Sequence, residues 1–510
     1  MPSAKKGSNP TAESGKSAGK VAGEVGSKGV GSKGNEGVNP LQHGELKRAL
    51  SSRQLQLIAI GGTIGTSLFL GTSKTISLAG PSIIIDYLIA GVVVFLTMRV
   101  LGEMLISDLR FRSFRDLVTH YLGPWGGFIT GWMYWGFWIV TGMQDSVAVS
   151  VYLEDYFPGM PRWLPGLSVV LIIFLLNSVA VNVFGEMEFW LSIIKIVAII
   201  TLILVGLVMV FSGQHFVYQT VDANGLQSSL DMQSSFNNLF DYGFFGHGAS
   251  GFLLGFQMAF LAYTGVEVIG TTAAEVKNPL VTLPRAINSI PLRISIFYIG
   301  TVFVILCAVP WNTIASLRGS PFVNIFTTIG IPAAGVIMTF VLITAAVSGA
   351  NSGLYSTSRM LFGLSIDGHA PRAFSKTSRS QVPQSALTFG LLVIAIPVVL
   401  VTIFDDNPMD AFMIFASWST GCILCVWILV LVSYFVYVSK HADLHNASTF
   451  KAPFGRISAG LCIAFLSFII IIMFFDTVPR LGIILAIASL LILFAVYRFK
   501  VHKIEHLEYE

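Results

Sequence analysis

The sequence predicts an all-α polytopic membrane protein with twelve transmembrane helices. Hydrophobic residues make up 54% of the 510 residues, charged residues make up 11%, and the mean hydropathy is +0.74. A soluble domain carries roughly 25% charged residues, so this chain has too few charges to cover a soluble surface of its size. Its apolar residues also gather in runs of about 20, the length that crosses a bilayer as a helix.

The first 50 residues differ from the rest of the chain. They are rich in Gly, Ser, Lys and Ala and hold almost no large apolar residues. Because such a segment cannot bury a core, we expect residues 1–50 to form a disordered cytoplasmic tail. The segment is too polar for a signal peptide, which needs an apolar stretch.

Twelve apolar runs follow the tail. They are too long for membrane strands and do not alternate strictly between apolar and polar residues, so we expect helices. The runs lie near residues 54–78, 81–101, 126–153, 164–182, 187–211, 251–274, 286–309, 333–357, 384–404, 409–437, 457–475 and 480–498.

The distribution of Lys and Arg predicts that both chain ends lie on the cytoplasmic side. Of the 31 Lys and Arg residues, Lys195 alone is counted within a span, and the others are counted with the tail or with the segment beside the nearest span end. Four fall in the segments that twelve alternating spans would place outside, namely Lys74, Arg162, Arg318 and Arg480. The segment 212–250 has no Lys or Arg, as suits an extracytoplasmic loop.

Two runs contain features that interrupt a helix. The first holds Gly61, Gly62 and Gly65, and each glycine weakens a helix by roughly 1 kcal/mol relative to Ala. The sixth holds Gly265, followed two residues later by Glu267. Close helix packing through small residues is the alternative explanation. Breaks at matching positions of two five-span halves are typical of inverted repeats with a substrate site at the bilayer midplane.

An amino acid suits two such breaks. The N-terminus of a half-helix offers free N–H groups to a carboxylate, and the C-terminus of another offers carbonyls to an ammonium. The first break contains no Asp, Glu or Arg that could pair with a charged side chain. The sequence therefore favours neutral amino acids as substrates.

Several stretches resemble the amino acid transporter family of the amino acid–polyamine–organocation (APC) superfamily. They are Gln56–Thr66, Leu101–Met104, Gly185–Trp190 with Lys195, Gly270–Glu275 and Ala350–Met360. The resemblance covers the chain from about residue 50 to residue 500. It implies a LeuT-like fold, in which a 5+5 inverted repeat is followed by two further helices. The implied parts are 51–211 and 251–437 for the two repeats, 212–250 for the loop, and 438–510 for the last two spans with a cytoplasmic C-terminus.

The resemblance also implies the substrate-binding residues. The carboxylate is expected at Gly65, Thr66 and Ser67. The ammonium is expected at carbonyls around Ile60, Phe260, Leu261 and Tyr263. Ala262 and Thr264 are also expected to bind the substrate. The family usually has Gly where this chain has Ser67, so we expect a narrower carboxylate end or an added hydroxyl donor there.

Lys195, in the fifth run, is the first candidate for proton coupling. An intramembrane lysine costs about 2.5–3.5 kcal/mol on insertion scales. Snorkelling toward the interface is the alternative. Relatives with a lysine in this span imply a proton-responsive cation in place of a sodium ion. Ser348 and Asn351 are then expected to line the former sodium site, although such side chains often bond only to their own helix.

Two acidic residues are the other candidates. Glu267 follows the break in the sixth run, where it is expected either to accept backbone N–H bonds or to titrate. Asp145, in the third run, is expected to tune substrate entry or to bond a polar partner, with a solvated cavity residue as the alternative. Cys422 and Cys425 form a C-x-x-C. Without a nearby His or further Cys, we interpret them as packing residues.

These features predict a secondary active transporter of the plasma membrane that imports small neutral amino acids with protons. The resemblance suggests D-serine, D-alanine, glycine and L-alanine. The sequence contains no P-loop, no G-x-S-x-G and no H-E-x-x-H, so neither ATP-driven transport nor an enzyme is expected. No cofactor, metal or nucleic acid is expected, and the chain is expected to be a monomer or weak dimer. The alternative is an exchanger, or a permease for aromatic, branched, proline or GABA substrates.

Overall fold

The computed structural model describes residues 64–501 except 112, 155, 178–180, 222–226, 272–277, 317–319, 329–331, 378–382 and 405–406. The chain divides into two units, Met1–Glu45 and Leu46–Glu510, and all the described residues belong to the second. The predicted tail, residues 1–50, and the predicted site residue Ile60 lie outside the described residues.

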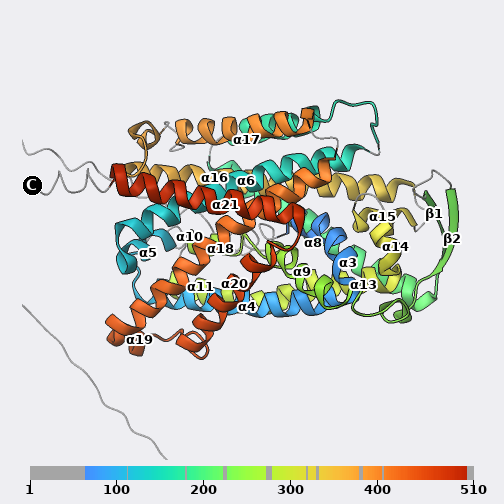
Figure 1. Ribbon diagram of the computed structural model, residues 1–510, viewed down its shortest axis with the longest axis horizontal. Helices are drawn as coiled ribbons and strands as arrows, with labels where there is room; N and C mark the ends of the chain where they lie inside the picture. The colour runs from blue at the N-terminus through green and yellow to red at the C-terminus, as the bar shows by residue number, and fades with distance from the viewer. Residues whose placement is uncertain are drawn as a thin grey trace, which may run out of the picture. The chain divides into compact units, whose positions relative to one another are not determined.

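Helices make up almost all of the described chain, as predicted (Figure 1). The first half contains α2 (Thr66–Phe69), α3 (Gly71–Ala79), η1 (Gly80–Ser82), α4 (Ile83–Ser107), α5 (Phe114–Leu122), α6 (Pro124–Glu154), α7 (Trp163–Asn177) and α8 (Val181–Ser212). The middle contains η2 (Phe236–Leu239), α9 (Gly248–Leu261), α10 (Val268–Thr271), α11 (Pro279–Asn288), α12 (Ile290–Arg293), the π-helix η4 (Ile294–Gly300), α13 (Thr301–Ala308), α14 (Trp311–Ser316) and α15 (Pro321–Thr328). The last part contains α16 (Pro332–Ile366), η5 (Arg372–Ser375), α17 (Gln384–Phe404), α18 (Pro408–Lys440), α19 (Ala442–Ala447), α20 (Arg456–Ile472), α21 (Thr477–Val496) and η6 (Tyr497–Val501).

The helices are long and apolar enough for a multi-pass membrane protein. Among the described residues, six helical stretches could each cross a bilayer by length and composition, and four shorter apolar helices accompany them. The 31-residue α6 is also about 46 Å long, at 1.5 Å per residue. Its Gly, Trp and Tyr residues make it less apolar than those six.

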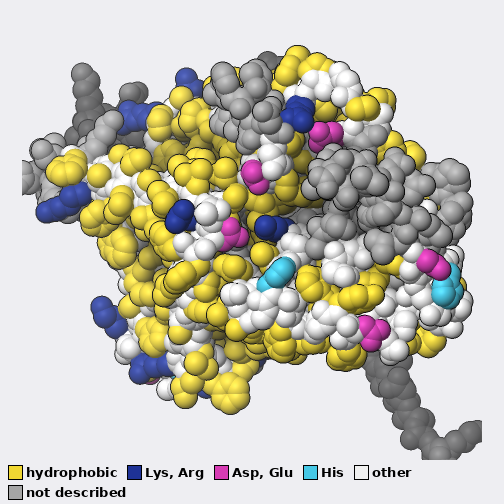
Figure 2. All heavy atoms as spheres, turned by 45° about the vertical axis from the view of Figure 1, so that its right-hand side comes forward, with side chains coloured by type: hydrophobic (Ala, Val, Ile, Leu, Met, Phe, Trp, Pro, Cys, Tyr) yellow, Lys and Arg dark blue, Asp and Glu magenta, His cyan; other side chains and the backbone are white. Residues whose placement is uncertain are grey.

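The outer surface is apolar where a soluble protein would be charged. Leu204, Val208 and Phe211 follow one face of α8 and are 59%, 67% and 76% exposed. Figure 2 shows hydrophobic side chains over most of the described surface on one face, with few charges among them. Lipid is the solvent that suits such a surface.

Three long helices form the centre of the core. The helix α6 packs along both α16 and α18, and α18 also packs against α21. Cys422 is buried in this core and Cys425 is half-buried, both as free thiols. The core therefore brings the third, eighth and tenth predicted runs together beside the two interrupted ones.

The predicted extracytoplasmic loop contains strands that the sequence did not suggest. In it β1 (His215–Val221) pairs antiparallel with β2 (Gln227–Gln233), so that His215 faces Gln233. After the hairpin, the Asn238 amide donates to the Cys307 carbonyl over 2.9 Å. The hairpin lies at one end of the second unit, and α5 and α19 lie at the other (Figure 1).

Candidate functional site

The sixth predicted span is broken where its glycine stands. The helix α9 ends at Leu261 and α10 begins at Val268, with turns between them. Gly265 has a φ of +97°, a conformation that L side chains rarely adopt. The Glu267 carboxylate accepts the Gly265 N–H over 2.9 Å. Glu267 thus makes the backbone contact expected of it, inside the break.

The first predicted span also has a non-helical segment. Gly65 is extended, with φ −122° and ψ −170°, and α2 begins at Thr66. The helix continues through Leu70, which has helical angles, into α3. Because the helix begins there, the N–H groups of Thr66 and Ser67 have no carbonyl within it to bond.

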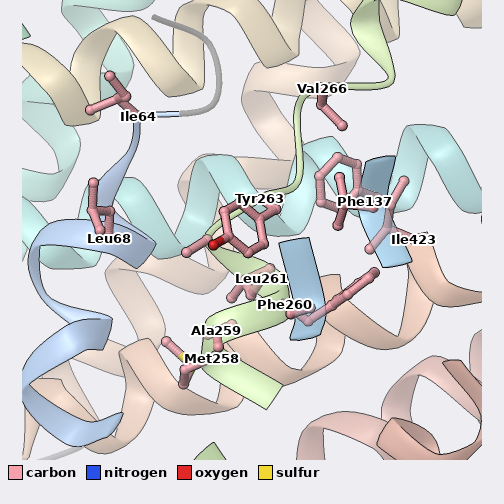
Figure 3. Close-up of a cluster of buried hydrophobic side chains, with 14 of the residues drawn as sticks. Ile64, Leu68, Phe137, Met258, Ala259, Phe260, Leu261, Tyr263, Val266 and Ile423 are labelled. Carbon is pink, nitrogen blue, oxygen red and sulfur yellow. The ribbon is translucent and has the colours of Figure 1, made fainter. Parts of the chain in front are cut away.

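The start of α2 and the break after α9 face each other. The helix α2 packs against α6, α9 and α16. Figure 3 shows Ile64 and Leu68 on one side and Leu261 and Tyr263, at the end of α9, on the other. All four side chains are buried. Apolar walls therefore surround the polar backbone ends.

A chain of hydrogen bonds connects the start of α2 to α6. Thr66 Oγ1 donates to Asp145 Oδ1 over 2.5 Å. Gln144 Nε2 donates to Ser67 Oγ over 3.0 Å and to Thr66 Oγ1 over 3.3 Å. Asp145 is only 2% exposed, so the solvated alternative for this residue does not fit the structure.

A second buried polar chain joins α8 to α16. Lys195 Nζ donates to Ser348 Oγ over 2.9 Å, and Ser348 Oγ donates to Glu188 Oε1. All three side chains are fully buried. Asn351, one turn further along α16, is also buried and lies beside the Glu188 carboxylate. Lys195 therefore does not snorkel to the surface, and it contacts Ser348, one of the two residues expected near it.

The two sets of polar contacts lie on neighbouring residues of α16. The helix α16 lies between them, since Ser348 contacts Lys195 while a Cβ on the next residue, Gly349, would lie 2.8 Å from Asp145 Oδ2. Consecutive residues of α16 therefore border Lys195 on one side and Asp145 on the other.

The carbonyls at the end of α9 are already in use. Ala262 accepts the Tyr298 hydroxyl over 2.9 Å, and Leu261 accepts both the N–H of Thr264, over 3.1 Å, and its Oγ1, over 2.7 Å. The Phe260 carbonyl accepts the Tyr263 N–H over 3.0 Å. A carbonyl has two lone pairs, so a ligand ammonium would share these acceptors rather than find them free.

Aromatic contacts hold these residues in place. The Tyr263 hydroxyl donates to the Tyr87 carbonyl over 2.8 Å, and the two rings meet edge to face. Phe260 packs edge to face on Trp427, with the ring centroids 5.1 Å apart. Packing thus fixes the position of both side chains, Phe260 and Tyr263.

The structure adds two residues that the sequence did not single out. Glu188 lies seven residues before Lys195, so two turns of helix put both on one face. That spacing was a usable signal, but Glu188 lies near the end of its predicted run, where a carboxylate is also compatible with the membrane interface. Gln144 precedes Asp145 and gave no signal. Among the described residues, no group of three His, Cys, Asp or Glu could hold a metal ion.

Known proteins are similar over most of the chain. Residues 54–504 match the family model described as amino acid permease. The D-serine/D-alanine/glycine transporter of Escherichia coli (strain K12) is 46% identical over 429 residues, which are 84% of this chain and 88% of that protein. The amino-acid permease AapA of Bacillus subtilis (strain 168) is 41% identical over 468 residues, which are 91% of this chain and 98% of the relative.

Proposed function

This chain belongs to the amino acid permease family, and we propose that it imports small neutral amino acids together with protons. It is an amino acid transporter rather than an enzyme, as its family and relatives are. The observation that carries the proposal is the break between α9 and α10, which faces the non-helical start of α2. The N–H groups at the start of α2 suit the carboxylate of an amino acid, and the carbonyls at the end of α9, which a ligand would share, suit its ammonium.

We place these breaks in a LeuT-like fold with twelve spans and both chain ends in the cytoplasm. The repeats would be 51–211 and 251–437, followed by 438–510 with the last two spans. Helices lie at each of the twelve predicted runs. The hairpin of segment 212–250 and the helices α5 and α19 lie at opposite ends (Figure 1), as this orientation requires.

For the substrate we propose D-serine, D-alanine, glycine and L-alanine. The first three are the amino acids in the name of the Escherichia coli relative. The carboxylate would bind the N–H groups of Gly65, Thr66 and Ser67, and the ammonium would share the carbonyls between Phe260 and Thr264. The large buried side chains around this position favour a small substrate over an aromatic or branched one.

Proton coupling would begin at Lys195. A buried lysine is tolerated here because the Glu188 carboxylate compensates its charge through Ser348. Loss of the lysine proton would leave Glu188 without a cation and would weaken the hold of α8 on α16. Asp145 lies beside Gly349 of α16 and accepts a hydrogen bond from Thr66, so it would transmit the movement of α16 to the proposed carboxylate-binding residues.

The partners of this cycle are the amino acid, protons and the lipid of the plasma membrane, with the protein acting as a monomer or weak dimer. A titrating Glu267 is a second proton site in this scheme. It borders a cavity of about 10 Å³ that is also lined by Thr97 and Trp427, enough for about one water.

The test is uptake of labelled D- and L-amino acids into proteoliposomes, with and without an inward proton gradient. We expect accumulation of glycine, alanine and serine that requires the gradient and stops with an uncoupler. Equal counterflow with or without the gradient would instead indicate an exchanger. Preference for aromatic, branched, proline or GABA substrates would contradict the proposed selectivity.

A further inference from the structure

The Gln144 side chain is held by two hydroxyls at the start of α2. It is fully buried on α6, and its Nε2 donates to Ser67 Oγ and Thr66 Oγ1. The orientation of the amide follows from Thr66, because that hydroxyl has one proton and donates it to Asp145. Thr66 Oγ1 can then only accept from Gln144, so the NH₂ group faces α2.

This orientation leaves the amide oxygen without a partner. Within the part of the chain that the structure describes, Gln144 Oε1 is buried and makes no hydrogen bond. A buried acceptor without a donor costs free energy, so native proteins rarely keep one unless a ligand or water completes it. The oxygen belongs to the same amide that bonds Ser67, and it is therefore fixed beside the proposed carboxylate-binding residues.

We propose that Gln144 Oε1 accepts a hydrogen bond from the side-chain hydroxyl of a bound serine and so favours serine over alanine. The inference rests on the proposed function and adds a specificity-determining residue to its site. The substrate donor would be the hydroxyl rather than the ammonium. Gln144 lies at the Thr66–Ser67 end of the site, whereas the carbonyls available to an ammonium lie at the end of α9.

Ser67 takes part in this selection indirectly. Its hydroxyl is the nearer of the two acceptors for Gln144 Nε2, at 3.0 Å against 3.3 Å for Thr66. Ser67 therefore acts as a positioning residue that holds the amide oxygen toward the substrate. Loss of this hydroxyl would leave one long hydrogen bond to orient the amide.

The test is the ratio of serine uptake to alanine uptake, measured for both enantiomers in proteoliposomes. Gln144→Met keeps the length of the side chain and removes its carbonyl. We expect the ratio to fall about five- to ten-fold, as the loss of one hydrogen bond predicts. Ser67→Ala should lower the ratio in the same direction by about two-fold.

The matched controls are Gln257→Met and Ser417→Ala. Gln257 is another buried glutamine whose Nε2 donates to a serine hydroxyl, Ser417 Oγ, over 2.7 Å. Neither control should change the ratio.

A Gln144→Met protein that carries both substrates at the wild-type ratio would overturn the inference. If Gln144→Met carries neither substrate, the Ser67→Ala variant is the test. A wild-type ratio of serine to alanine uptake in Ser67→Ala would then overturn the inference. A wild-type protein that carries neither serine nor alanine would refute the proposed function itself.

Discussion

Two buried glutamates show how differently this protein uses the same side chain. Glu103, on α4, accepts the Tyr434 hydroxyl over 2.9 Å and the Ala452 N–H over 2.7 Å, and it lies 2.6 Å from His445 Nδ1. Both of its oxygens are therefore bonded. Glu188, on α8, accepts Ser348 at Oε1, but its Oε2 has no hydrogen-bond partner among the described residues.

The difference separates a fixed contact from one that can rearrange. Glu103 joins α4 to α18 and to the residues around α19, and Arg99 strengthens this end by donating to the Lys451 carbonyl over 2.5 Å. A fully bonded buried carboxylate loses much when any partner leaves. Glu188 and Lys195 both bond Ser348, and within the described part of the chain Glu188 Oε2 accepts no hydrogen bond, so fewer hydrogen bonds must break when these side chains move. We therefore expect substitution of Glu188 to affect transport and substitution of Glu103 to affect mainly stability.

The largest expected effect is on Lys195. Lys195→Met leaves Glu188 buried without a cation, and we expect proton-driven accumulation to fall at least about ten-fold, equivalent to 1.4 kcal/mol or more. The measurement is uptake in proteoliposomes with an imposed pH gradient. Lys74→Met, which changes a partly exposed lysine on α3, is the control. Accumulation equal to wild type would remove Lys195 from the coupling mechanism.

Replacing each of the two glutamates by glutamine tests the comparison between them. Glu103→Gln should lower the stability of the protein by about 2–3 kcal/mol, because three contacts to a charged acceptor are weakened. Glu188→Gln should lose proton-driven uptake, because it leaves Lys195 buried without the carboxylate that compensates its charge. Thermal unfolding in detergent measures the first effect, and uptake measures the second. Loss of proton-driven uptake in both variants, or in neither, would show that the two regions do not differ in transport.

Gly349 tests the connection between Lys195 and the substrate end. In Gly349→Ala the added Cβ would lie 2.8 Å from Asp145 Oδ2, so the carboxylate must shift away from Thr66. Loss of that hydrogen bond should lower uptake about five-fold. Gly136→Ala is the matched control, because its Cβ would meet Cys422 Sγ at an ordinary 3.8 Å. Comparable uptake by both variants would argue against the connection.

Sequence alone predicted an all-α membrane protein and some of the contacts among the candidate residues. Apolar runs located the helices, and the glycine beside Glu267 located the break, because both depend on local composition. Lys195 and Ser348 were expected to meet, and they do. The pairing of Glu188 with Ser348 depends instead on how α8 packs on α16, which no local pattern encodes.

Other parts of the site could not be predicted, for related reasons. Gln144 contacts Thr66 and Ser67 only because α6 packs against α2, and no local pattern in the sequence indicates that packing. The hairpin of segment 212–250 was not predicted, because the pairing of β1 with β2 leaves no mark in the hydropathy pattern that identifies membrane spans.

The smallest expected effect lies outside both regions. Asp108, in the loop after α4, pairs with Arg110 over 2.6 Å, and the Arg110 hydrogen bond lowers the pKa of Asp108 below its usual 3.8. A lowered pKa means that the stabilisation is present above the usual value and is lost as the pH falls through the lower, folded one. Because Arg110 is exposed, solvent screens the pair. Arg110→Ala should leave uptake and thermal unfolding at pH 7 unchanged, and a clear loss at that pH would show that this pair matters more than exposure allows.

Coupled entry of protons and amino acid is the claim that joins the Lys195 region to the substrate end. It is tested most directly by trapping a pH-sensitive dye inside wild-type proteoliposomes and adding glycine, alanine or serine outside at equal pH. We predict that the interior acidifies as the amino acid enters and that an amino acid which is not carried causes no change. Entry of labelled amino acid with no acidification would contradict proton coupling.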